Sequence, residues 1–468
     1  MQPPIVVDLD GTLVRTDTLW EALLHLLRHR PWRLLWLPLW FLRGRAYGKT
    51  RLLAEAMPDV ELLPYRREVL DWLRKEREQG RQIILATASP VALGEAIARK
   101  LSLFDAVLAS TDRRNLRGRE KLQAIRELLG QQPFEYLGNS RVDSPLWTAA
   151  IAAHVVGSRR FVRRMRRRFP HGRDFLSQHR WRALLRLMRP HQWVKNLLVF
   201  VPIMLAHRLT EWQLWKAAAV AFAALSLVAS GLYVLNDLLD IEADRQHPRK
   251  RHRPLASGEI PLWAGILLMW GLVSAGLLLA VETLPTLFLV ALLLYAGASM
   301  LYSFWLKTLP LVDVVVLAGL YTVRVLAGGW ATQVPLSGWL LTFAIFLFLS
   351  LGFLKRYAEL RLGLHSKLPR RGYAAEDEAV VRGFGTSSGF LAVLVFVLYV
   401  SSPAVQQLYR QPQWLWLTTP LWVYWITHLW LVAHRRQMHD DPLLFVLRDP
   451  ISYATAAGIA LLMVLSSL

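Results

Sequence analysis

The spacing of apolar positions divides the chain into two parts of different kind. In the first third, short apolar runs lie at residues 5–7, 83–86 and 134–137, and polar residues follow each of them. Such runs are typical of buried β-strands, whereas the apolar spacing of residues 122–129 is that of a helix. Strands that alternate with helices predict a parallel α/β sheet, which holds ligands at the carboxyl ends of its strands.

From about residue 193 onward the apolar runs become long. Nine of them lie near residues 193–208, 212–235, 261–281, 284–304, 311–332, 337–354, 387–403, 415–434 and 451–468. Most approach the roughly 20 residues that a helix needs to cross a bilayer. The sequence therefore predicts a multidomain protein. An α/β domain occupies residues 1–156, a basic juxtamembrane linker 157–188, and an all-α polytopic membrane domain of about nine transmembrane helices 189–468.

Composition narrows the classes of function. The net charge is +22, which in a soluble protein would indicate a nucleic-acid partner, but 54% of the residues are apolar. Together with the long apolar runs, this balance favours a membrane surface and anionic lipids, and no nucleic-acid motif accompanies the arginines of the linker. Because the chain has no cysteine, disulfides, thiolate nucleophiles and cysteine-bound zinc are excluded.

The distribution of charge predicts the orientation in the membrane. The N-terminus has no basic region followed by a long apolar stretch, so we expect no signal peptide and a cytoplasmic α/β domain. Nine spans would then place the C-terminus outside the inner (cytoplasmic) membrane. Basic residues concentrate in the predicted inner loops, at 245–253, 307, 355–371 and 435–436, whereas the outer loops are nearly uncharged, in agreement with the positive-inside rule.

Polar residues that could carry chemistry follow the predicted strands. The first strand ends in the sequence DLDGT, which contains Asp8 and Asp10, the second ends at Thr87, and the third leads to Asn139 and Asp143. Lys121 opens the predicted helix at 122–129. The identity and order of these residues over positions 4–155 resemble the haloacid dehalogenase (HAD) superfamily of phosphate-transferring hydrolases.

This resemblance implies a role for each residue. Asp8 would attack phosphorus as the nucleophile, and Asp10 would protonate the leaving oxygen as general acid/base. Thr87 and Lys121 would bind the phosphate. The implied Mg²⁺ would be held by Asp8, Asp10, Asn139 and Asp143. The family usually has aspartate at the position of Asn139, so the site has one negative charge fewer, and a domain kept only as a scaffold remains an alternative.

A mostly helical insert at residues 16–75 lies where this family places a cap over the active site. It contains the apolar segment 32–42, which is rich in tryptophan and flanked by arginines. Eleven residues are too few to span a bilayer but suit a helix that lies among lipid headgroups. The segment could equally belong to the core of the cap or contact the membrane domain.

A second acidic cluster follows the apolar run 212–235. In a helix, Asn236, Asp240 and Asp244 would be four residues apart, and Asp237 three before Asp240, so all four would share one face. Stacked carboxylates repel one another unless a cation lies between them, and Mg²⁺ is usually held by such groups together with substrate phosphates. The basic run that ends at Arg253 could bind the remaining phosphate charge. The alternative is a solvated charged loop at a membrane surface.

Further candidate substrate-binding residues lie on the predicted inner side of the membrane. They are Lys195, Tyr302, Lys307, Asp313, Arg324, Lys355 and Arg356. Arg324 falls inside a predicted span, where a charge is expensive and usually functional. A salt bridge from Arg324 to Asp313 or to another acid is the simpler explanation, although it is compatible with binding of an anion.

The nine-helix layout and the sequence NDxxDxxxD from Asn236 to Asp244 resemble the UbiA superfamily of intramembrane prenyltransferases. The family uses this motif to bind Mg²⁺ and a substrate pyrophosphate, and its usual members carry a second aspartate motif. Here that region offers Asp313 alone. Within the superfamily, the segments RPHQWVKN (189–196), NDLLDIEADRQHPRKRHRPLASG (236–258), YSFWLK (302–307), VRVLAGG (323–329) and KRYAEL (355–360) resemble the decaprenyl-phosphate phosphoribosyltransferase branch.

This second resemblance implies a bifunctional membrane enzyme. One domain would join polyprenyl phosphate to phosphoribosyl pyrophosphate (PRPP), and the HAD-like domain would remove the 5-phosphate to give a sugar donor for envelope glycans. Both domains would use Mg²⁺, with Asp237, Asp240 and Asp244 as the catalytic carboxylates of the transferase. The chain could also form a homo-oligomer. The alternatives are a prenyltransferase that uses an allylic diphosphate and an aromatic acceptor, a membrane-anchored regulatory protein, and a transporter.

Overall fold

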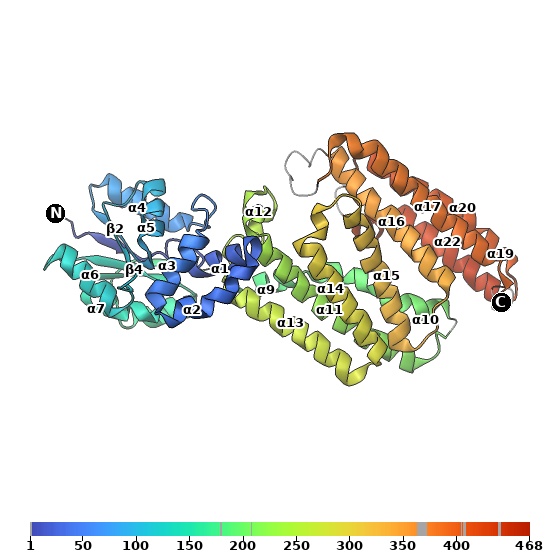
Figure 1. Ribbon diagram of the computed structural model, residues 1–468, viewed down its shortest axis with the longest axis horizontal. Coiled ribbons are helices and arrows are strands. Elements are labelled where there is room, and N and C mark those ends of the chain that lie inside the picture. The colour runs from blue at the N-terminus through green and yellow to red at the C-terminus, as the bar shows by residue number, and fades with distance from the viewer. Residues whose placement is uncertain are drawn as a thin grey trace. The chain divides into compact units, whose positions relative to one another are not determined.

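The computed structural model describes residues 2–177, 180–206, 208–362, 372–403, 405, 409–438 and 441–468 (Figure 1). The chain forms two compact units. One contains Met1–Met188 together with Tyr233–Trp270, and the other contains Arg189–Leu232 together with Gly271–Leu468. Each unit is described by itself.

The first unit is built on a parallel sheet of six strands. They are β1 (Ile5–Val7), β2 (Ile83–Pro90), β3 (Ala106–Ser110), β4 (Glu135–Gly138), β5 (Ala152–Gly157) and β6 (Asp174–Leu176), in the spatial order β3-β2-β1-β4-β5-β6. In the centre, Val6 of β1 is opposite Ile84 of β2 and Tyr136 of β4. The predicted α/β class is confirmed, and the carboxyl ends of β1, β2 and β4 lie side by side.

Alternate residues of the central strands point to opposite faces of the sheet, as the pleat requires. Ile5 and Val7 pack with helices α4 (Arg67–Glu78) and α5 (Val91–Leu101), whereas Val6 packs with α6 (Arg119–Leu129) and α7 (Ser144–Ala149). Figure 1 shows the two pairs of helices on the two sides of the sheet. Both faces are therefore covered, which explains why the strands are apolar throughout.

The cap consists of α1 (Thr18–His29), the 3₁₀ helix η1 (Pro31–Trp36), α2 (Leu37–Leu42) and α3 (Arg45–Glu55). It is shorter than the predicted range 16–75, because α4 packs on the sheet. Gly48 of α3 lies so close to the ring of Phe41 in α2 that a Cβ atom would be 2.9 Å from it. The outer face of η1 and α2 stays apolar and exposed, at Trp32, Leu35, Trp36, Leu39 and Leu42.

The prediction of a basic linker at 157–188 needs correction, because most of this segment is folded. Helix α8 (Arg159–Arg166) buries Val162 and Met165 against the sheet, and β6 adds the last strand. Val162 and Met165 are three residues apart, so they lie on the same face of α8. The arginines between them concealed this pattern in the sequence. Helix α9 (Arg180–Met188) follows.

The aspartate motif also belongs to the first unit. It spans the end of α11 (Trp212–Leu239) and α12 (Ile241–Gln246), and it is followed by the 3₁₀ helix η4 (Lys250–His252). Val234, Leu238 and Ile241 pack with Leu24 of the cap helix α1 and with Leu187 of α9. This segment therefore shares a hydrophobic core with the N-terminal domain.

The second unit is helical. Besides most of α11 and of α13 (Leu262–Thr283), its elements are η3 (Pro190–Phe200), α10 (Val201–Leu205), α14 (Thr286–Phe304), η5 (Leu306–Thr308), α15 (Val312–Thr332), α16 (Gly338–Arg361), η7 (Ala375–Asp377), α17 (Glu378–Val400), α19 (Gln413–Trp416), α20 (Thr418–His434), α21 (Pro442–Val446) and α22 (Pro450–Ser467). Helix α15 packs between α14 and α16, and α17 packs against α16 and α20.

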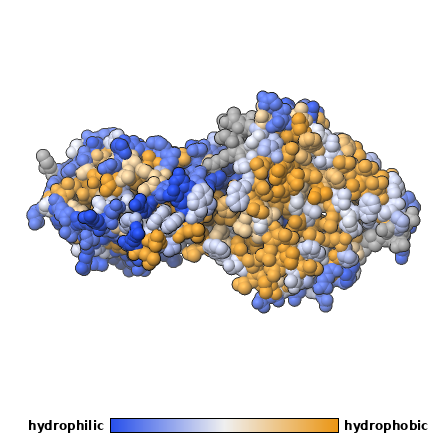
Figure 2. All heavy atoms as spheres, viewed as in Figure 1, coloured by the Kyte–Doolittle hydropathy of each residue, from blue (hydrophilic) through white to orange (hydrophobic). Residues whose placement is uncertain are grey.

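Among the described residues, seven helices are long and apolar enough to cross a membrane: Trp212–Leu239, Leu262–Thr283, Thr286–Phe304, Val312–Thr332, Gly338–Arg361, Ala375–Val400 and Pro450–Ser467. The predicted count was nine. The run at 193–208 forms η3 and the five-residue helix α10, and the run at 415–434 gives the 17-residue helix α20. Apolar side chains dominate the visible face of the helical part in Figure 2, in keeping with a multi-pass membrane protein.

Candidate active sites

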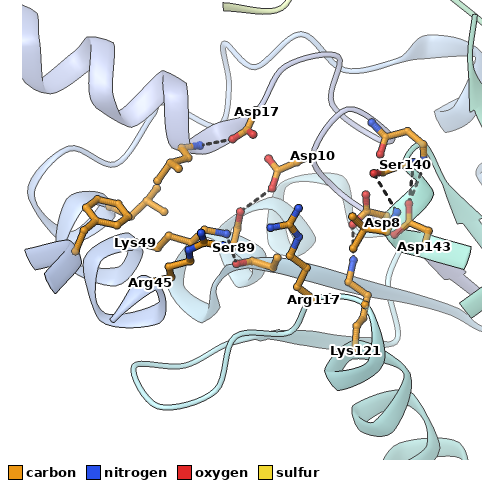
Figure 3. Close-up of a pocket in the computed structure, with 17 residues that line it drawn as sticks. Asp8, Asp10, Asp17, Arg45, Lys49, Ser89, Arg117, Lys121, Ser140 and Asp143 are labelled. Carbon is orange, nitrogen blue, oxygen red and sulfur yellow. Dashed lines mark hydrogen bonds and ion pairs between the residues drawn. The ribbon is translucent and has the colours of Figure 1, made fainter. Parts of the chain in front are cut away.

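A cavity of about 480 Å³ opens at the carboxyl ends of the central strands (Figure 3). Its lining residues are Asp8, Asp10, Asp17, Leu19, Phe41, Arg45, Lys49, Leu53, Ala88, Ser89, Arg117, Gly118, Lys121, Asn139, Ser140, Val142 and Asp143. The predicted residues Asp8, Asp10, Lys121, Asn139 and Asp143 therefore meet in one place, although they are far apart in the sequence.

Asp8 lies at the bottom of this cavity, directly after β1. Lys121 of α6 donates to one of its carboxylate oxygens at 2.6 Å, and the hydroxyl of Thr12 donates to the other at 3.1 Å. Burial disfavours the charge of Lys121, but the carboxylates of Asp8 and Asp143 outweigh it and raise the pKa of the lysine. Lys121 therefore stays charged and fixes the orientation of Asp8.

Asp10 is held by the start of the cap and by β2. It accepts hydrogen bonds from the backbone and hydroxyl of Thr18, both at 2.8 Å, and from the hydroxyl of Ser89 at 2.9 Å. Burial, followed by the charge of Asp17, raises the pKa of Asp10 to about 6. A carboxyl whose pKa lies this close to neutral pH is suited both to give and to take a proton.

The hydroxyl that β2 presents to the cavity is Ser89. Thr87, the predicted phosphate ligand, is fully buried and is not among the lining residues, and its hydroxyl accepts a hydrogen bond from the backbone of Ser89 at 3.0 Å. The sequence prediction missed Ser89 because the apolar run ends at Ala86, whereas the strand continues to Pro90. Its spacing from Thr87 could have indicated that Ser89 faces the cavity, because residues two apart in a strand lie on the same face of the sheet.

Asp143 and Asn139 complete the oxygen-rich end of the cavity. Asp143 accepts hydrogen bonds from the backbone of Asn139 and Ser140, at 3.2 and 2.9 Å. Burial, followed by the charge of Asp8, raises the pKa of Asp143 to about 6. The carboxylates of Asp8, Asp10 and Asp143 and the amide of Asn139 offer oxygen donors of the kind that Mg²⁺ takes, so the donor set fits this ion.

The mouth of the cavity carries three basic residues that the sequence prediction missed. Arg45 and Lys49, four residues apart on α3, lie on one side, and Arg117 precedes α6 (Figure 3). The ring of Phe41 adds an apolar patch beside them. The four-residue spacing of Arg45 and Lys49 within the predicted cap could have indicated this pair, since positions four apart share a helix face.

The aspartate motif is interrupted by a break at Asp240. Helix α11 ends at Leu239 and α12 begins at Ile241, although two backbone bonds, from Asp240 to Asn236 at 2.9 Å and from Asp244 to Asp240 at 2.8 Å, keep the helical spacing. The predicted single helix is therefore two helices, and the four-residue spacing of the motif continues across the break. Asn236 is half-buried in the last turn of α11.

The carboxylates of the motif have different partners. The Arg253 guanidinium joins Asp237 and Asp244, at 3.0 and 2.6 Å, whereas Asp240 accepts from Arg28 of the cap at 2.6 Å. Burial raises the pKa of Asp244 to about 6, although Arg253 opposes this shift. Two buried carboxylates that converge on one cation are a donor set that also fits Mg²⁺.

In the second unit, Arg324 is buried in the middle of α15. It donates to the amide oxygen of Asn196 at 2.9 Å, to the hydroxyl of Tyr295 at 3.0 Å and to the carbonyl of Leu320. The suggested salt bridge to Asp313 is not formed. The charge of Arg324 is thus held by neutral groups and by the faces of two tyrosine rings, Tyr295 and Tyr321, and keeps its attraction for an anion.

Lys195 and Lys355 converge on Asp441, which precedes α21. Both ammonium groups bind the same carboxylate oxygen, at 2.9 and 3.0 Å. Although burial disfavours its charge, Lys355 and Lys195 hold the pKa of Asp441 well below its usual range. This trio carries a net charge of +1. The sequence did not indicate Asp441, because it follows the apolar run 415–434 without a motif.

Asp313 and Arg356 form a salt bridge in the interior of the helical unit, and neither side chain has any exposed surface. Arg356 also binds Glu359 at 2.7 Å and the hydroxyl of Tyr302 at 3.1 Å, and Tyr373 donates to Asp313. The predicted residues Tyr302, Asp313 and Arg356 therefore lie together. Lys307 is half-buried in η5, between α14 and α15.

Comparison with known families decides what kind of protein carries these sites. Residues 197–448, more than half of the chain, match the UbiA prenyltransferase family. The protein is a member of this family. Residues 5–148 match the haloacid dehalogenase-like hydrolases. The chain is therefore a prenyltransferase-type transferase fused to a HAD hydrolase domain.

Individual proteins match different shares of the chain. The uncharacterized protein y4nM of Sinorhizobium fredii is 34% identical over 466 residues, which cover 98% of this chain and 90% of that protein. Decaprenyl-phosphate phosphoribosyltransferase of Mycolicibacterium smegmatis is 38% identical over 227 residues, 47% of this chain and 70% of that enzyme. A UbiA homolog from Archaeoglobus fulgidus, solved with GPP and Mg²⁺, has 17% identity and a TM-score of 0.47, and covers 61% of this chain and 100% of its own.

Proposed function

We propose that the UbiA domain transfers the 5-phosphoribosyl group of PRPP to a polyprenyl phosphate, and that the HAD domain then removes the 5-phosphate. The observation that carries the first half is the state of Asp313. By the resemblance to the family, Asp313 is the single carboxylate of the region in which usual members carry a second aspartate motif. It is fully buried and paired with Arg356. A carboxylate in this position cannot hold a second Mg²⁺ without breaking a buried salt bridge, which is costly.

The cations of the helical unit suit this reaction. Both substrates are polyanions. Lys195 and Lys355 share one carboxylate, Asp441, and Arg324 is held by neutral groups, so this region offers an excess of positive charge. The similarity of residues in this region to a decaprenyl-phosphate phosphoribosyltransferase points to the same substrate class. The candidates for binding the lipid phosphate and the 5-phosphate are Lys195, Lys307, Arg324 and Lys355.

The transfer needs no side-chain nucleophile. A phosphate oxygen of the lipid attacks C1 of the ribose, the bond from C1 to the pyrophosphate oxygen breaks, and pyrophosphate leaves with the bonding electrons. Mg²⁺ held by Asn236, Asp237, Asp240 and Asp244 would neutralise the leaving charge. Arg253, which bridges Asp237 and Asp244 in the structure, is close enough to bind the pyrophosphate once an ion takes its place.

In the second step Asp8 attacks the phosphorus of the 5-phosphate. The bond to the ribose oxygen breaks, Asp10 gives this oxygen its proton, and an aspartyl-phosphate forms on Asp8. Asp10 then removes a proton from a water molecule, whose oxygen attacks the phosphorus and releases inorganic phosphate. Lys121 compensates the negative charge beside Asp8. Mg²⁺ held by Asp8, Asp10, Asn139 and Asp143 would offset the charge of the phosphate.

The mouth of the HAD cavity suits a substrate with a second phosphate. The proposed intermediate keeps a phosphodiester between the ribose and the lipid, and Arg45, Lys49 and Arg117 could bind it. The lipid chain would follow the exposed apolar face of η1 and α2, which continues from Phe41. A soluble sugar phosphate would need neither feature.

We further infer the setting of these reactions. The HAD domain and the motif would lie on the cytoplasmic side of the inner membrane, where PRPP and anionic lipids are present, with the C-terminus outside. The product, a polyprenyl-phosphoryl-ribose, is an activated sugar in lipid-bound form. Its chemistry is that of a donor for cell-envelope glycans.

Lipid analysis of three purified proteins tests the proposal. Each is incubated with PRPP, Mg²⁺ and a polyprenyl phosphate. Wild type should give lipid-phosphoryl-ribose, Asp8→Asn should stop at the 5-phosphorylated lipid, and Asp240→Asn should give neither. If pyrophosphate is released and the 5-phosphate stays on the lipid in the wild type, the second half is wrong. If no ribose reaches the lipid but an allylic diphosphate is consumed with an aromatic acceptor, the alternative prenyltransferase reaction is correct.

A further inference from the structure

The cap helix α1 of the phosphatase domain meets the transferase motif through one face. Glu21, His25 and Arg28 are four and three residues apart, so they project from the same side of the helix. Each binds a residue of the segment 240–245: Arg245, Glu242 and Asp240 respectively. Three polar contacts in register between two short helices make a defined interface within the first unit.

Glu21 and Arg245 anchor this interface. The two side chains form a fork-shaped pair, with distances of 2.7 and 3.1 Å, and only 3% and 6% of their surfaces are exposed. Arg245 also donates to the carbonyl of Ala256 at 2.9 Å, which ties the loop after α12 to the same point. A buried arginine–carboxylate pair of this geometry fixes orientation as well as distance.

Arg28 reaches the motif itself. One of its nitrogens donates both to the carboxylate of Asp240 at 2.6 Å and to the carbonyl of Leu239 at 2.5 Å. That carbonyl lies at the break where α11 ends, and a cation at the last carbonyls of a helix stabilises its end. Arg28 therefore holds both the break and the side chain of Asp240 in place.

Apolar contacts surround these pairs. Leu24 of α1 is buried with Val234, just before the motif, and with Leu238 and Ile241, which lie between its polar positions. Trp20 and Leu27 pack at the edge of this cluster. The apolar residues of the motif segment are therefore buried against α1, a helix of the phosphatase domain.

We propose that α1 of the phosphatase cap is a working part of the transferase site, with Arg28 as the positioning residue for Asp240. The inference rests on the proposed function only in that Asp240 is taken as a ligand of the transferase Mg²⁺. Partners that hydrogen-bond to a metal-ligating carboxylate fix its orientation, and their loss typically lowers metal affinity or activity about 10- to 100-fold. The transferase then depends on the physical presence of the cap but not on phosphatase chemistry.

Metal binding tests Arg28 without any turnover. The full-length protein with Asp8→Asn and Asp143→Asn, which weakens the phosphatase metal site, is titrated with Mn²⁺ as a spectroscopic probe. Adding Arg28→Ala should weaken the remaining Mn²⁺ site about tenfold, and Arg28→Lys should restore part of this loss. Unchanged or tighter binding would overturn the proposal, since tighter binding means that Arg28 competes with the ion.

Charge reversal tests the anchor. Glu21→Arg should abolish release of pyrophosphate from PRPP, and the double variant with Arg245→Glu should recover it, because the pair is restored in the opposite sense. Arg186→Ala is the matched control. It removes a pair between α9 and Glu259, which lies outside the segment 240–245, and should have no effect.

These results separate the two proposals. If wild type releases no pyrophosphate from PRPP, the proposed function fails, while the Mn²⁺ titration still decides the role of Arg28. If wild type is active but Glu21→Arg is equally active, the dependence on the cap fails alone. A Glu21→Arg protein whose cleavage of a small phosphate monoester is intact has a folded HAD domain, so its loss of pyrophosphate release is not general unfolding.

Discussion

Asn139 lowers the negative charge of the HAD cavity with a single side chain. It lies with three carboxylates, Asp8, Asp10 and Asp143, and packs over Gly11, where a Cβ atom would be 2.0 Å from its amide nitrogen. Gly11 has a φ of +74°, which other residues rarely adopt. The amide therefore fills a space that a side chain at position 11 would close, and an aspartate would fit there with nearly the same shape.

We expect Asn139→Asp to strengthen Mg²⁺ binding in the phosphatase. Opposite unit charges about 4 Å apart attract by roughly 1 kcal/mol even in water, so the half-saturating Mg²⁺ concentration should fall about fivefold or more. Without Mg²⁺ the added charge repels Asp8 and Asp143, and the unfolding temperature should drop. The measurement is phosphate release against Mg²⁺ concentration, with Asn139→Ala as control. An unchanged Mg²⁺ dependence would mean that residue 139 does not touch the ion.

The buried pair Asp313–Arg356 predicts a large effect on stability. Arg356→Met leaves a carboxylate without compensation in the interior and should cost about 3–5 kcal/mol, whereas Arg356→Met with Asp313→Asn should cost clearly less. Thermal unfolding in detergent compares the two. Arg208→Met removes an exposed pair with Glu211 and should leave the unfolding temperature unchanged. If the double variant is no better than the single one, the pair does not carry the stability.

At the scale of elements, helix α3 is expected to select the phosphatase substrate. Arg45 and Lys49 line the cavity mouth, and a hydrogen bond to a charged group contributes roughly 1.5–3 kcal/mol. Each change to alanine should therefore raise the KM for the lipid-linked phosphodiester substrate about tenfold or more. The KM for a small phosphate monoester should stay the same. Arg51→Ala, on the same helix but bonded to Tyr47 on the surface, is the control. Equal losses for both substrates would assign α3 a structural role.

Elements with a strong local pattern could be predicted from the sequence. The runs at 5–7, 83–86 and 134–137 form β1, the first half of β2 and most of β4, because an apolar strand between helices has a simple signature. Helix α8 and strand β6 could not, since seven arginines between 159 and 168 conceal the two apolar residues, Val162 and Met165, that face the core. The break at Asp240 also has no local cause, because the cation that stabilises it comes from residue 28.

Pairing of charges lies beyond the reach of sequence patterns. The motif residues Asp8, Asp10, Lys121 and Asp143 could be found because the order of strands brings their ends together. Lys195 and Asp441 are 246 residues apart and share no motif, yet they meet in the helical unit. Which acid neutralises which cation is decided by helix packing, and this is why Arg324 was expected beside Asp313 but lies with Asn196 and Tyr295.

At the scale of the whole molecule, the covalent link between two enzymes has a measurable consequence. The proposed intermediate is a lipid and stays in the membrane in which it is made. A phosphatase on the same chain meets it at a high effective concentration, whereas one in another membrane does not meet it at all. The fusion should therefore increase the rate of dephosphorylation most in membranes that contain few copies of the protein.

Complementation between two inactive variants makes this testable. Asp8→Asn and Asp240→Asn are placed in separate lipid nanodiscs, one protein in each, and mixed with PRPP, Mg²⁺ and polyprenyl phosphate. The mixture should release pyrophosphate but almost no inorganic phosphate, while wild-type discs should release both without a lag. In a shared vesicle the two variants should recover phosphate release after a lag, because the intermediate must diffuse between chains. Rapid phosphate release from the separate discs would show that the intermediate leaves the membrane, and the link would then give no kinetic advantage.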